Sequence, residues 1–310
     1  MKIVFFGSSE FAVPSLERLL EHGHEVLSVV TRPDKKKGRH LALSETPVKK
    51  ASLKKGVNIF QPENPEEPGF LKKIESLDAD LFVVSSYGRI LTKNILSLPK
   101  IYCINLHPSL LPAYRGAAPV NWAVIRGEKK TGLTIIKMNE KMDAGDIILQ
   151  RRVIIEKEDT SLTLNKRLSE LGAILLLDAV RFVKEDRVSF KKQNNRKVTF
   201  APKLKKEDGA IDWEKPAAEI HNLVRGTLPW PGAYTYFGEE KINIWKTTVM
   251  DGNARPGEIV QAQKELIIGS KNLLIRVDQI QLEGKRRMGP PEFLRGYRKL
   301  KKGDSFRVKK

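Results

Sequence analysis

The chain has 310 residues, a length that suits two domains better than one, and 40% of its residues are apolar, which is enough for a packed core. Lys and Arg number 56 against 37 Asp and Glu, a formal net charge of +19. The apolar content argues against wholesale disorder, and the absence of any stretch near 18 consecutive apolar residues argues against a membrane span. A one-sided charge surplus this large favours a polyanionic partner, of which nucleic acid is the commonest.

The first part of the chain alternates apolar runs with amphipathic stretches, a pattern typical of parallel strands joined by crossover helices. Strands are predicted at Lys2–Phe6 and Glu25–Thr31, with a helix at Val13–Glu21 between them. Because the N-terminal apolar run is short and turns polar at once, it indicates a strand and not a signal peptide, and we expect a cytoplasmic protein. Only Gly7 stands where a dinucleotide fingerprint would have three glycines, so NAD binding is not expected.

The pattern continues through the rest of the first domain. It predicts a buried strand, a short helix, a second buried strand, two extended segments and a long helix, at Leu81–Ser85, Thr92–Leu98, Tyr102–Leu106, Thr134–Met138, Ile147–Ile155 and Leu162–Lys184. Together these elements predict an α/β, doubly wound, Rossmann-like catalytic domain over residues 1–187. Cys103, the single cysteine, lies in the apolar run IYCINL and is interpreted as a core residue and not as a nucleophile. No histidine pair has the spacing of metal ligands, so no metal is expected.

The composition changes after the long predicted helix. Residues 188–207 are polar and basic and are broken by Pro202, which predicts a linker. A short helix at Ala217–Arg225 is followed by apolar triplets separated by Pro and Gly, a pattern of short strands at turn spacing. Residues 208–310 are therefore predicted to form a smaller, OB-like β-barrel domain.

The residues best suited to chemistry lie near the end of the predicted strand Tyr102–Leu106. Asn105 and His107 are two positions apart, so both side chains point the same way, toward the crevice where α/β sheets bind ligands. An amide beside an imidazole can stabilise a developing oxyanion and move a proton, and Asp143, in the turn-prone MDAGDIILQ, can orient the imidazole. A lone histidine at a strand end is structural more often than catalytic, so this spacing alone leaves both interpretations open.

The surrounding sequence resembles the catalytic core of the formyltransferases that use 10-formyltetrahydrofolate. The shared features are His-Pro-Ser-Leu-Leu-Pro, Arg-Gly, Ala-Pro and Trp in NLHPSLLPAYRGAAPVNW, then Thr-Gly-x-Thr and Met-Asp-x-Gly in TGLTIIKMNEKMDAGDI. The resemblance implies that Asn105, His107 and Asp143 are the catalytic residues, without a metal or a covalent enzyme intermediate. Through SYGRIL and the Ser-Leu-Leu-Pro segment, it implies folate contacts by Arg89, Ile90, Leu91, Ser109, Leu110, Leu111 and Pro112.

Three further features resemble the members of this family that act on methionyl-tRNA. They are the loop TRPDKKKGRHLALSETPVKKAS, the stretch FAPKLKKEDGAIDW, and a basic end in which residues 281–310 hold 11 Lys and Arg against 3 Asp and Glu. The implied tRNA contacts are Lys35, Lys36, Lys37, Arg39, Lys203, Lys205 and Lys206. For the loop alone, the alternative is a solvated charge run. For the whole charge surplus, the alternative is the surface of a heat-adapted protein, but such a surface enriches both signs of charge together.

The resemblance thus implies transfer of the formyl group of 10-formyltetrahydrofolate to the free amino group of initiator methionyl-tRNA, which supplies translation initiation. The alternative enzyme is a formyltransferase acting on a UDP-amino sugar. The alternative from another class is a non-catalytic RNA-binding protein with a decayed core, against which the intact set of Asn105, His107 and Asp143 argues. We expect a monomer without membrane association, with initiator methionyl-tRNA and folate as its partners.

Overall fold

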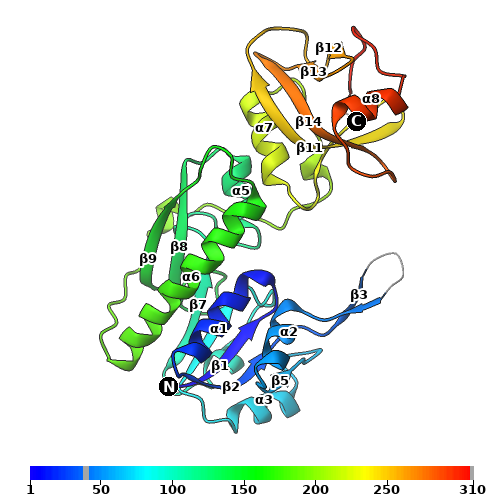
Figure 1. Cartoon of the computed structure of the whole chain (residues 1–310). Coiled ribbons are helices and arrows are strands. Elements are labelled where there is room, and N and C mark those ends of the chain that lie inside the picture. Colours follow the sequence, from blue (N-terminus) through cyan, green and yellow to red (C-terminus); the bar gives the residue numbers. More distant parts are fainter. Residues whose placement is uncertain (38–41, 308–310) are drawn as a thin grey trace. The chain divides into compact units, whose positions relative to one another are not determined.

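The computed structural model describes residues 1–37 and 42–307, and the chain divides into two compact units (Figure 1). Unit 1 consists of Met1–Pro119, Lys130–Ile154 and Asn165–Pro202, and unit 2 of Val120–Lys129, Ile155–Leu164 and Lys203–Lys310. In the described ranges no helix combines the length and the apolar character needed to cross a membrane. The predicted fold class is confirmed, since unit 1 has an α/β fold around a mainly parallel sheet and unit 2 contains an antiparallel sheet.

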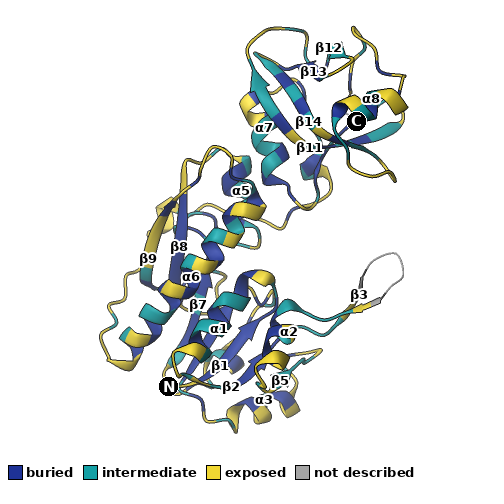
Figure 2. Cartoon of the chain, in the orientation of Figure 1, coloured by how far each residue is buried: buried dark blue, intermediate teal, exposed yellow. Residues whose placement is uncertain are grey.

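Unit 1 contains a seven-stranded sheet in the order β5-β2-β1-β6-β7-β8-β9. The strands are, in that order, Ile59–Phe60, Glu25–Val30, Lys2–Gly7, Leu81–Ser85, Tyr102–His107, Lys130–Lys137 and Ile147–Ile154. The first five pair in parallel, and β8 and β9 pair antiparallel at one side. Strands β1 and β6 are buried along almost their whole length (Figure 2), as parallel strands covered on both faces must be, which is why their sequences are continuous apolar runs.

The α-helices that lie wholly or mainly in unit 1 are α1, α2, α3, α4 and α6, at Val13–Glu21, Pro47–Lys54, Pro68–Glu75, Lys93–Leu96 and Ser161–Lys184. Proline stands in the first turn of α1, α2 and α3, where its missing N–H costs nothing. Gly172 lets α6 approach β7 closely, because a Cβ there would lie 2.8 Å from Leu106 Cδ2. Helix α6 therefore supports the strand that carries Asn105 and His107.

A two-stranded hairpin, β3 (Lys35–Lys37) and β4 (Ala42–Ser44), projects from unit 1 after β2 (Figure 1). Asp34 lies at its base, where Oδ2 is 2.5 Å from Lys49 Nζ and Oδ1 accepts a 2.8 Å hydrogen bond from Gln61 Nε2. A second carboxylate, Glu45, lies 3.4 Å from the same ammonium. We call Asp34, Glu45, Lys49 and Gln61 the hairpin clamp.

Unit 2 contains a five-stranded antiparallel sheet in the order β10-β11-β14-β13-β12. The strands are Ala233–Phe237, Glu240–Met250, Leu274–Leu282, Leu266–Gly269 and Ile259–Ala262. Helices α5, α7 and α8, at Pro119–Ile125, Ala217–Gly226 and Pro290–Gly296, also lie mainly in this unit. Its core packs Ile220 of α7 with Ile244 and Ile275 of the sheet.

The two edges of this sheet are bridged by the same short segment near the C-terminus. Arg307 forms a bridge to Tyr236 in β10, and Ser305 forms one to Glu258, which precedes β12. Because β10 and β12 are the outermost strands of the sheet, the segment that carries Ser305 and Arg307 turns an open sheet toward a closed, barrel-like arrangement.

The polar stretch 188–207 divides between the units, since Pro202 ends unit 1 and Lys203 begins the last segment of unit 2. Its first part is bound to unit 1, where Lys191 bridges to Ile147 and Phe200 bridges to Arg115. We call residues 191–201 the strap.

Candidate active site

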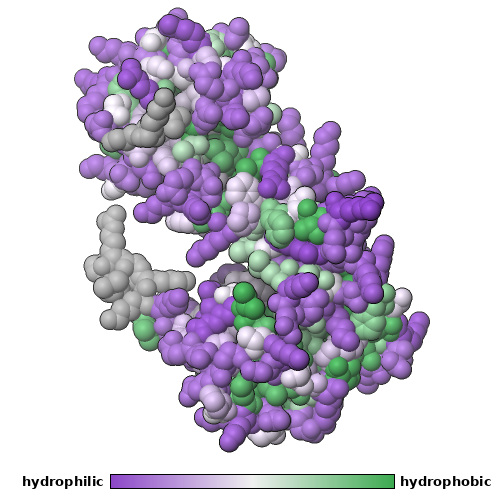
Figure 3. Space-filling model, turned by 180° about the vertical axis from the view of Figure 1, so that it is seen from behind, coloured by the Kyte–Doolittle hydropathy of each residue, from purple (hydrophilic) through white to green (hydrophobic). Residues whose placement is uncertain are grey.

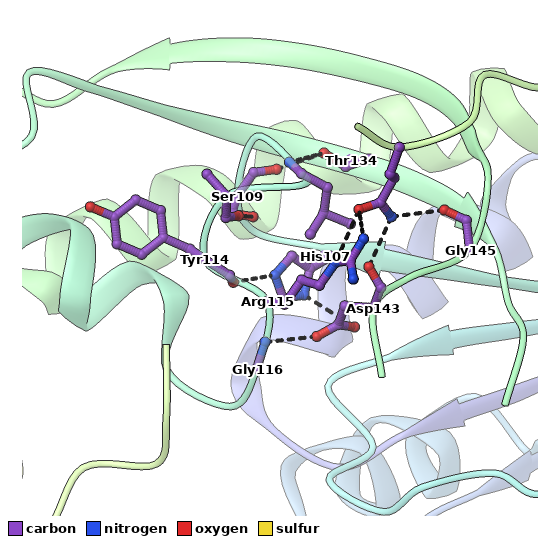
Figure 4. A network of polar contacts seen from close by, with 11 residues as sticks. His107, Ser109, Tyr114, Arg115, Gly116, Thr134, Asp143 and Gly145 are labelled. Atoms are coloured by element: carbon purple, nitrogen blue, oxygen red, sulfur yellow. Dashed lines mark hydrogen bonds and ion pairs between the residues drawn. The ribbon is translucent and has the colours of Figure 1, made fainter. Parts of the chain in front are cut away.

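His107 ends β7 and is almost fully buried, with 4% of its surface exposed. Its Nδ1 lies 3.6 Å from Asp143 Oδ1, and its Nε2 lies 2.9 Å from the Tyr114 carbonyl oxygen (Figure 4). A carbonyl only accepts, so Nε2 must donate to Tyr114, while Nδ1 faces the carboxylate beyond hydrogen-bond distance. Both ring nitrogens therefore face oxygen atoms, which fixes the orientation of the imidazole.

Asn105 lies two residues before His107 on the same strand. It pairs with Val84 of β6 on one side and with Ile136 of β8 on the other, so it stands inside the sheet and not at its edge. Its side chain is half-buried, and among the described residues none forms a hydrogen bond with its amide. An amide without a protein partner can donate to a reacting oxygen.

Asp143 sits at a sharp turn between β8 and β9. Its φ of 51° lies in the left-handed region, and its Oδ2 accepts a 2.9 Å hydrogen bond from Gly116 N. Two residues on, a Cβ at position 145 would lie 1.8 Å from Lys137 O, so only glycine fits there. The Asp-x-Gly pattern thus has a steric cause: Gly145 lets the loop fold back onto β8 and carry Asp143 to His107.

Two residues to which the sequence assigned no role hold this loop. Gln193 Nε2 donates to the carbonyl oxygens of Asp143 and Gly145, at 2.8 Å each. Its Oε1 accepts from Arg115 Nε at 3.1 Å and from Nη2 at 2.7 Å. Arg115 is 8% exposed, and burial lowers the pKa of its guanidinium while the charge of Asp143 opposes that shift. Arg115 belongs to the Arg-Gly motif, but Gln193 lies in the predicted linker, where no local pattern marks it.

The Ser-Leu-Leu-Pro segment forms a loop after β7 that is held by hydrogen bonds from β8 and β9. Ser109 is fully buried; its Oγ donates to Ala113 O at 2.7 Å, and its carbonyl accepts from Thr134 Oγ1 at 2.6 Å. Leu111 is 3% exposed and its carbonyl accepts a 2.7 Å hydrogen bond from Gln150 Nε2. Leu110 and Pro112, the other two residues of the segment, are partly exposed.

The SYGRIL segment follows β6, the neighbour of β7. Arg89 Nη1 donates to Glu63 O at 2.5 Å, and Ile90 is 70% exposed. Leu91 is 2% exposed and packs in the core with Tyr87 and Ile95. Of the three predicted folate residues in this segment, only Arg89 and Ile90 therefore reach solvent.

Of the predicted tRNA contacts, Lys35, Lys36 and Lys37 form strand β3 of the hairpin, and Lys203, Lys205 and Lys206 follow directly after the strap. Lys35 is exposed, as are Lys203, Lys205 and Lys206. The side chains of Lys36 and Lys37, and the whole of Arg39, lie outside the described residues. Most of the face seen in Figure 3 is hydrophilic, in keeping with a chain of charge +19. In residues 1–37 and 42–307, no cluster of three or more His, Cys, Asp or Glu side chains is arranged to hold a metal ion.

Comparison with known proteins matches both parts of the chain. Residues 1–180 match the family model described as formyl transferase, and residues 203–298 match the model described as formyl transferase, C-terminal domain. The chain is 46% identical over 300 residues to methionyl-tRNA formyltransferase of Caldanaerobacter subterraneus subsp. tengcongensis, covering 96% of this chain and 97% of the relative. It is 47% identical over 305 residues to the enzyme of the same name from Thermodesulfovibrio yellowstonii, covering 98% of each.

Solved structures share the fold at lower sequence identity. An N-formyltransferase from Helicobacter canadensis, in complex with folinic acid and dTDP-3-aminofucose, superposes with a TM-score of 0.70 at 19% identity, covering 89% of this chain and 98% of that one. Methionyl-tRNA formyltransferase from Clostridium thermocellum gives a TM-score of 0.57 at 17% identity, covering 80% of this chain and 93% of that one. Identities this low support the fold alone.

Proposed function

This chain belongs to the formyl transferase family, and from that premise we propose that it transfers a formyl group from 10-formyltetrahydrofolate to the amino group of initiator methionyl-tRNA. The observation that carries the chemistry is the convergence of Asp143 on His107 at the end of β7, two residues after an Asn105 amide that is engaged by none of the described residues. The proposed site of the reaction is therefore the end of β7 in unit 1.

The residue types suit acyl transfer to an amine. The amine nitrogen attacks the formyl carbon, a new C–N bond forms, and negative charge develops on the formyl oxygen. Asn105 Nδ2 donates to that oxygen, and such a donor contributes about 10²–10³ in rate at comparable sites. The His107 ring, two residues away on the same strand, supports the developing charge as the second polar group of the site. The bond to N10 of the folate then breaks, and the proton lost by the amine passes to N10, directly or through water, with Asp143 orienting His107.

The choice of acceptor rests on similarity over the whole chain and on charge. Relatives named methionyl-tRNA formyltransferase match both units at 46–47% identity over nearly their whole length. A net charge of +19 also suits a polyanionic acceptor better than a sugar nucleotide. The donor is of folate type, with 10-formyltetrahydrofolate as its proposed form.

We assign the binding residues as follows, on the strength of the motifs alone. The folate contacts are Arg89, Ile90, Leu91, Ser109, Leu110, Leu111 and Pro112, and the tRNA contacts are Lys35, Lys36, Lys37, Arg39, Lys203, Lys205 and Lys206. Lysines add affinity through phosphate with little sequence information, whereas an arginine also reads base edges. Arg39→Ala should therefore lower kcat/KM for methionyl-tRNA by about tenfold or more, and the lysine changes should mainly reduce the salt slope.

The decisive experiment is formyl transfer from 10-formyltetrahydrofolate to aminoacylated initiator tRNA, compared with free methionine and with a UDP-amino sugar. We expect transfer to the tRNA alone, with kcat/KM falling steeply as salt rises, because phosphate contacts release counterions. Faster transfer to the sugar, with a shallow salt dependence, would establish the alternative acceptor. Sedimentation of the free enzyme tests the proposal that it acts as a monomer.

A further inference from the structure

We propose that Gln193 is a positioning residue for the catalytic carboxylate, and that the strap, residues 191–201, holds both partners of the His107 ring in place. The inference rests on the proposed function, since it assigns a role in that reaction. It concerns a segment whose polar composition predicts only a linker.

The first observation is that every donor and acceptor of the Gln193 amide is bonded, and that it joins the Asp143 loop to Arg115. Its two N–H groups donate to the carbonyl oxygens of Asp143 and Gly145, at 2.8 Å each, and its oxygen accepts twice from Arg115. The two carbonyls flank the turn at which Asp143 has a φ of 51°, a conformation that costs about 1–2 kcal/mol for a residue other than glycine. Gln193 thus holds the backbone of this turn at two carbonyl groups, one of them that of Asp143 itself.

The second observation concerns the carboxylate itself. Asp143 Oδ2 accepts from Gly116 N, and the segment before Gly116 is paired with the strap: Arg115 N donates to Thr199 O at 2.9 Å, and Ala201 N donates to Arg115 O at 2.8 Å. Gly116 has a φ of 125°, and a Cβ there would lie 2.6 Å from Ala201 O. The strap therefore passes directly against the backbone that holds the Asp143 carboxylate.

The third observation concerns the opposite side of the imidazole. His107 Nε2 donates to the Tyr114 carbonyl, and the Tyr114 N–H in turn donates to Thr199 Oγ1 at 2.9 Å. Both oxygen partners of the ring, the Asp143 carboxylate and the Tyr114 carbonyl, are therefore held by residues of one strap. Catalysis is sensitive to such support, since a displacement of about 1 Å at a reacting group can cost about 10²-fold in rate.

The test compares Gln193→Met, which keeps the length of the side chain but none of its hydrogen bonds, with Asn195→Ala as a control. Asn195 is exposed on the same strap and has no role in the network. Gln193→Met should lower the single-turnover rate with aminoacylated tRNA by about tenfold to a hundredfold, while KM for the tRNA changes less than about twofold. Asn195→Ala should match the wild type in both.

A second measurement needs no substrate. Amide hydrogen exchange in the peptide covering residues 139–146 should become faster in Gln193→Met, while exchange in β1 and β6 and the melting temperature stay close to wild type. A Gln193→Glu variant keeps the oxygen that accepts from Arg115 but loses both donors to the loop, so it should behave like Gln193→Met.

Unchanged turnover in Gln193→Met would overturn the inference, as would slower turnover accompanied by faster exchange throughout unit 1, because that pattern marks a merely structural residue. If wild-type protein formylates no tRNA, the proposed function fails, yet local exchange at residues 139–146 still decides whether Gln193 holds the loop.

Discussion

Asn105, His107 and Asp143 differ in how far the protein already engages them. Asp143 gives Gly116 N its acceptor and His107 is hydrogen-bonded to Tyr114, whereas the Asn105 amide has no such bond among the described residues. We therefore predict that Asn105→Ala lowers kcat by about 10²-fold or more with little change in melting temperature. Asp143→Ala should lower both, because it leaves a backbone N–H without its acceptor.

His107→Ala should match the loss of kcat in Asn105→Ala or exceed it. Single-turnover rates and thermal unfolding of the three variants make the comparison, with folate binding as the control for an intact pocket. A folded His107→Ala enzyme that turned over at nearly the wild-type rate would refute the assignment of general acid–base and oxyanion roles to this strand.

Cys103 lies two residues before Asn105 on β7 and is 2% exposed, which confirms its interpretation as a core residue. Burial raises the pKa of its thiol to about 12. A raised pKa disfavours the reactive thiolate, so at pH 8 only about one molecule in 10⁴ would carry it. A thiol reagent should leave the native protein unlabelled at pH 8 and label one thiol in denaturant. Rapid labelling of the native protein would show that β7 opens readily.

At the scale of elements, the stability that the hairpin clamp contributes depends on pH. Hydrogen bonds from Lys49 and Gln61 lower the pKa of Asp34 below its ordinary value. A lowered pKa means that this stabilisation is complete above the unfolded pKa of about 3.9 and is lost as pH falls through the folded value. Asp34→Asn should lower the melting temperature by about 2–4 °C between pH 5 and 8, and the difference from wild type should shrink below pH 4.

The matched control is Asp78→Asn. Asp78 also lies 2.5 Å from a lysine, Lys100, but 64% of the Asp78 side chain is exposed, against 13% for Asp34. Exposed pairs contribute little, so Asp78→Asn should leave the melting temperature nearly unchanged. Equal effects of the two substitutions would mean that the clamp does not order the base of the hairpin.

The elements that the sequence predicted well are those whose signal is local. Strands β6 and β7 appear at or within one residue of the predicted bounds, because an apolar run between turns defines a buried parallel strand. Strand β8 begins at Lys130 and not at Thr134 as predicted. Its first residues, including Gly132, have no apolar signal, and their strand character comes from pairing with β9.

The strap shows where sequence reasoning stops. Lys191 to Ala201 is polar and basic, as a linker is, and its partners lie far away in the chain: Gln193 contacts Arg115, 78 residues earlier, and Thr199 contacts Tyr114, 85 residues earlier. Asn105, His107 and Asp143 could be predicted because they belong to one continuous family motif in the sequence. Gln193 could not be predicted, because only folding brings it to the Asp143 loop.

At the scale of the whole molecule, the two units are interleaved along the chain. Unit 2 takes in residues 120–129 and 155–164, and these are bound by the C-terminal segment. Asn121 Nδ2 donates to Gly226 O at 2.8 Å, and Ser161 Oγ donates to Leu228 O at 2.6 Å. Gly226 packs so closely on Ile125 that a Cβ would lie 2.6 Å from its Cγ1. Truncation of the chain in the linker therefore removes only part of unit 2 and leaves residues 120–129 and 155–164 of that unit attached to unit 1.

Two truncated chains separate the contributions of the strap and of unit 2. A chain of residues 1–206 keeps the strap and hence the partners of His107, so it should bind folate; without residues 207–310, however, Asn121 and Ser161 lose their acceptors, and its melting temperature should fall. It should also use methionyl-tRNA poorly.

A chain of residues 1–187 additionally lacks Gln193 and Thr199, so it should bind folate more weakly than the 1–206 chain, and amide hydrogen exchange at residues 139–146 should be faster. Fluorescence titration with folate and amide hydrogen exchange measure both. If the two chains bound folate equally and exchanged alike at residues 139–146, the site would need no strap, and its geometry would have to come from β7 and the Asp143 loop alone.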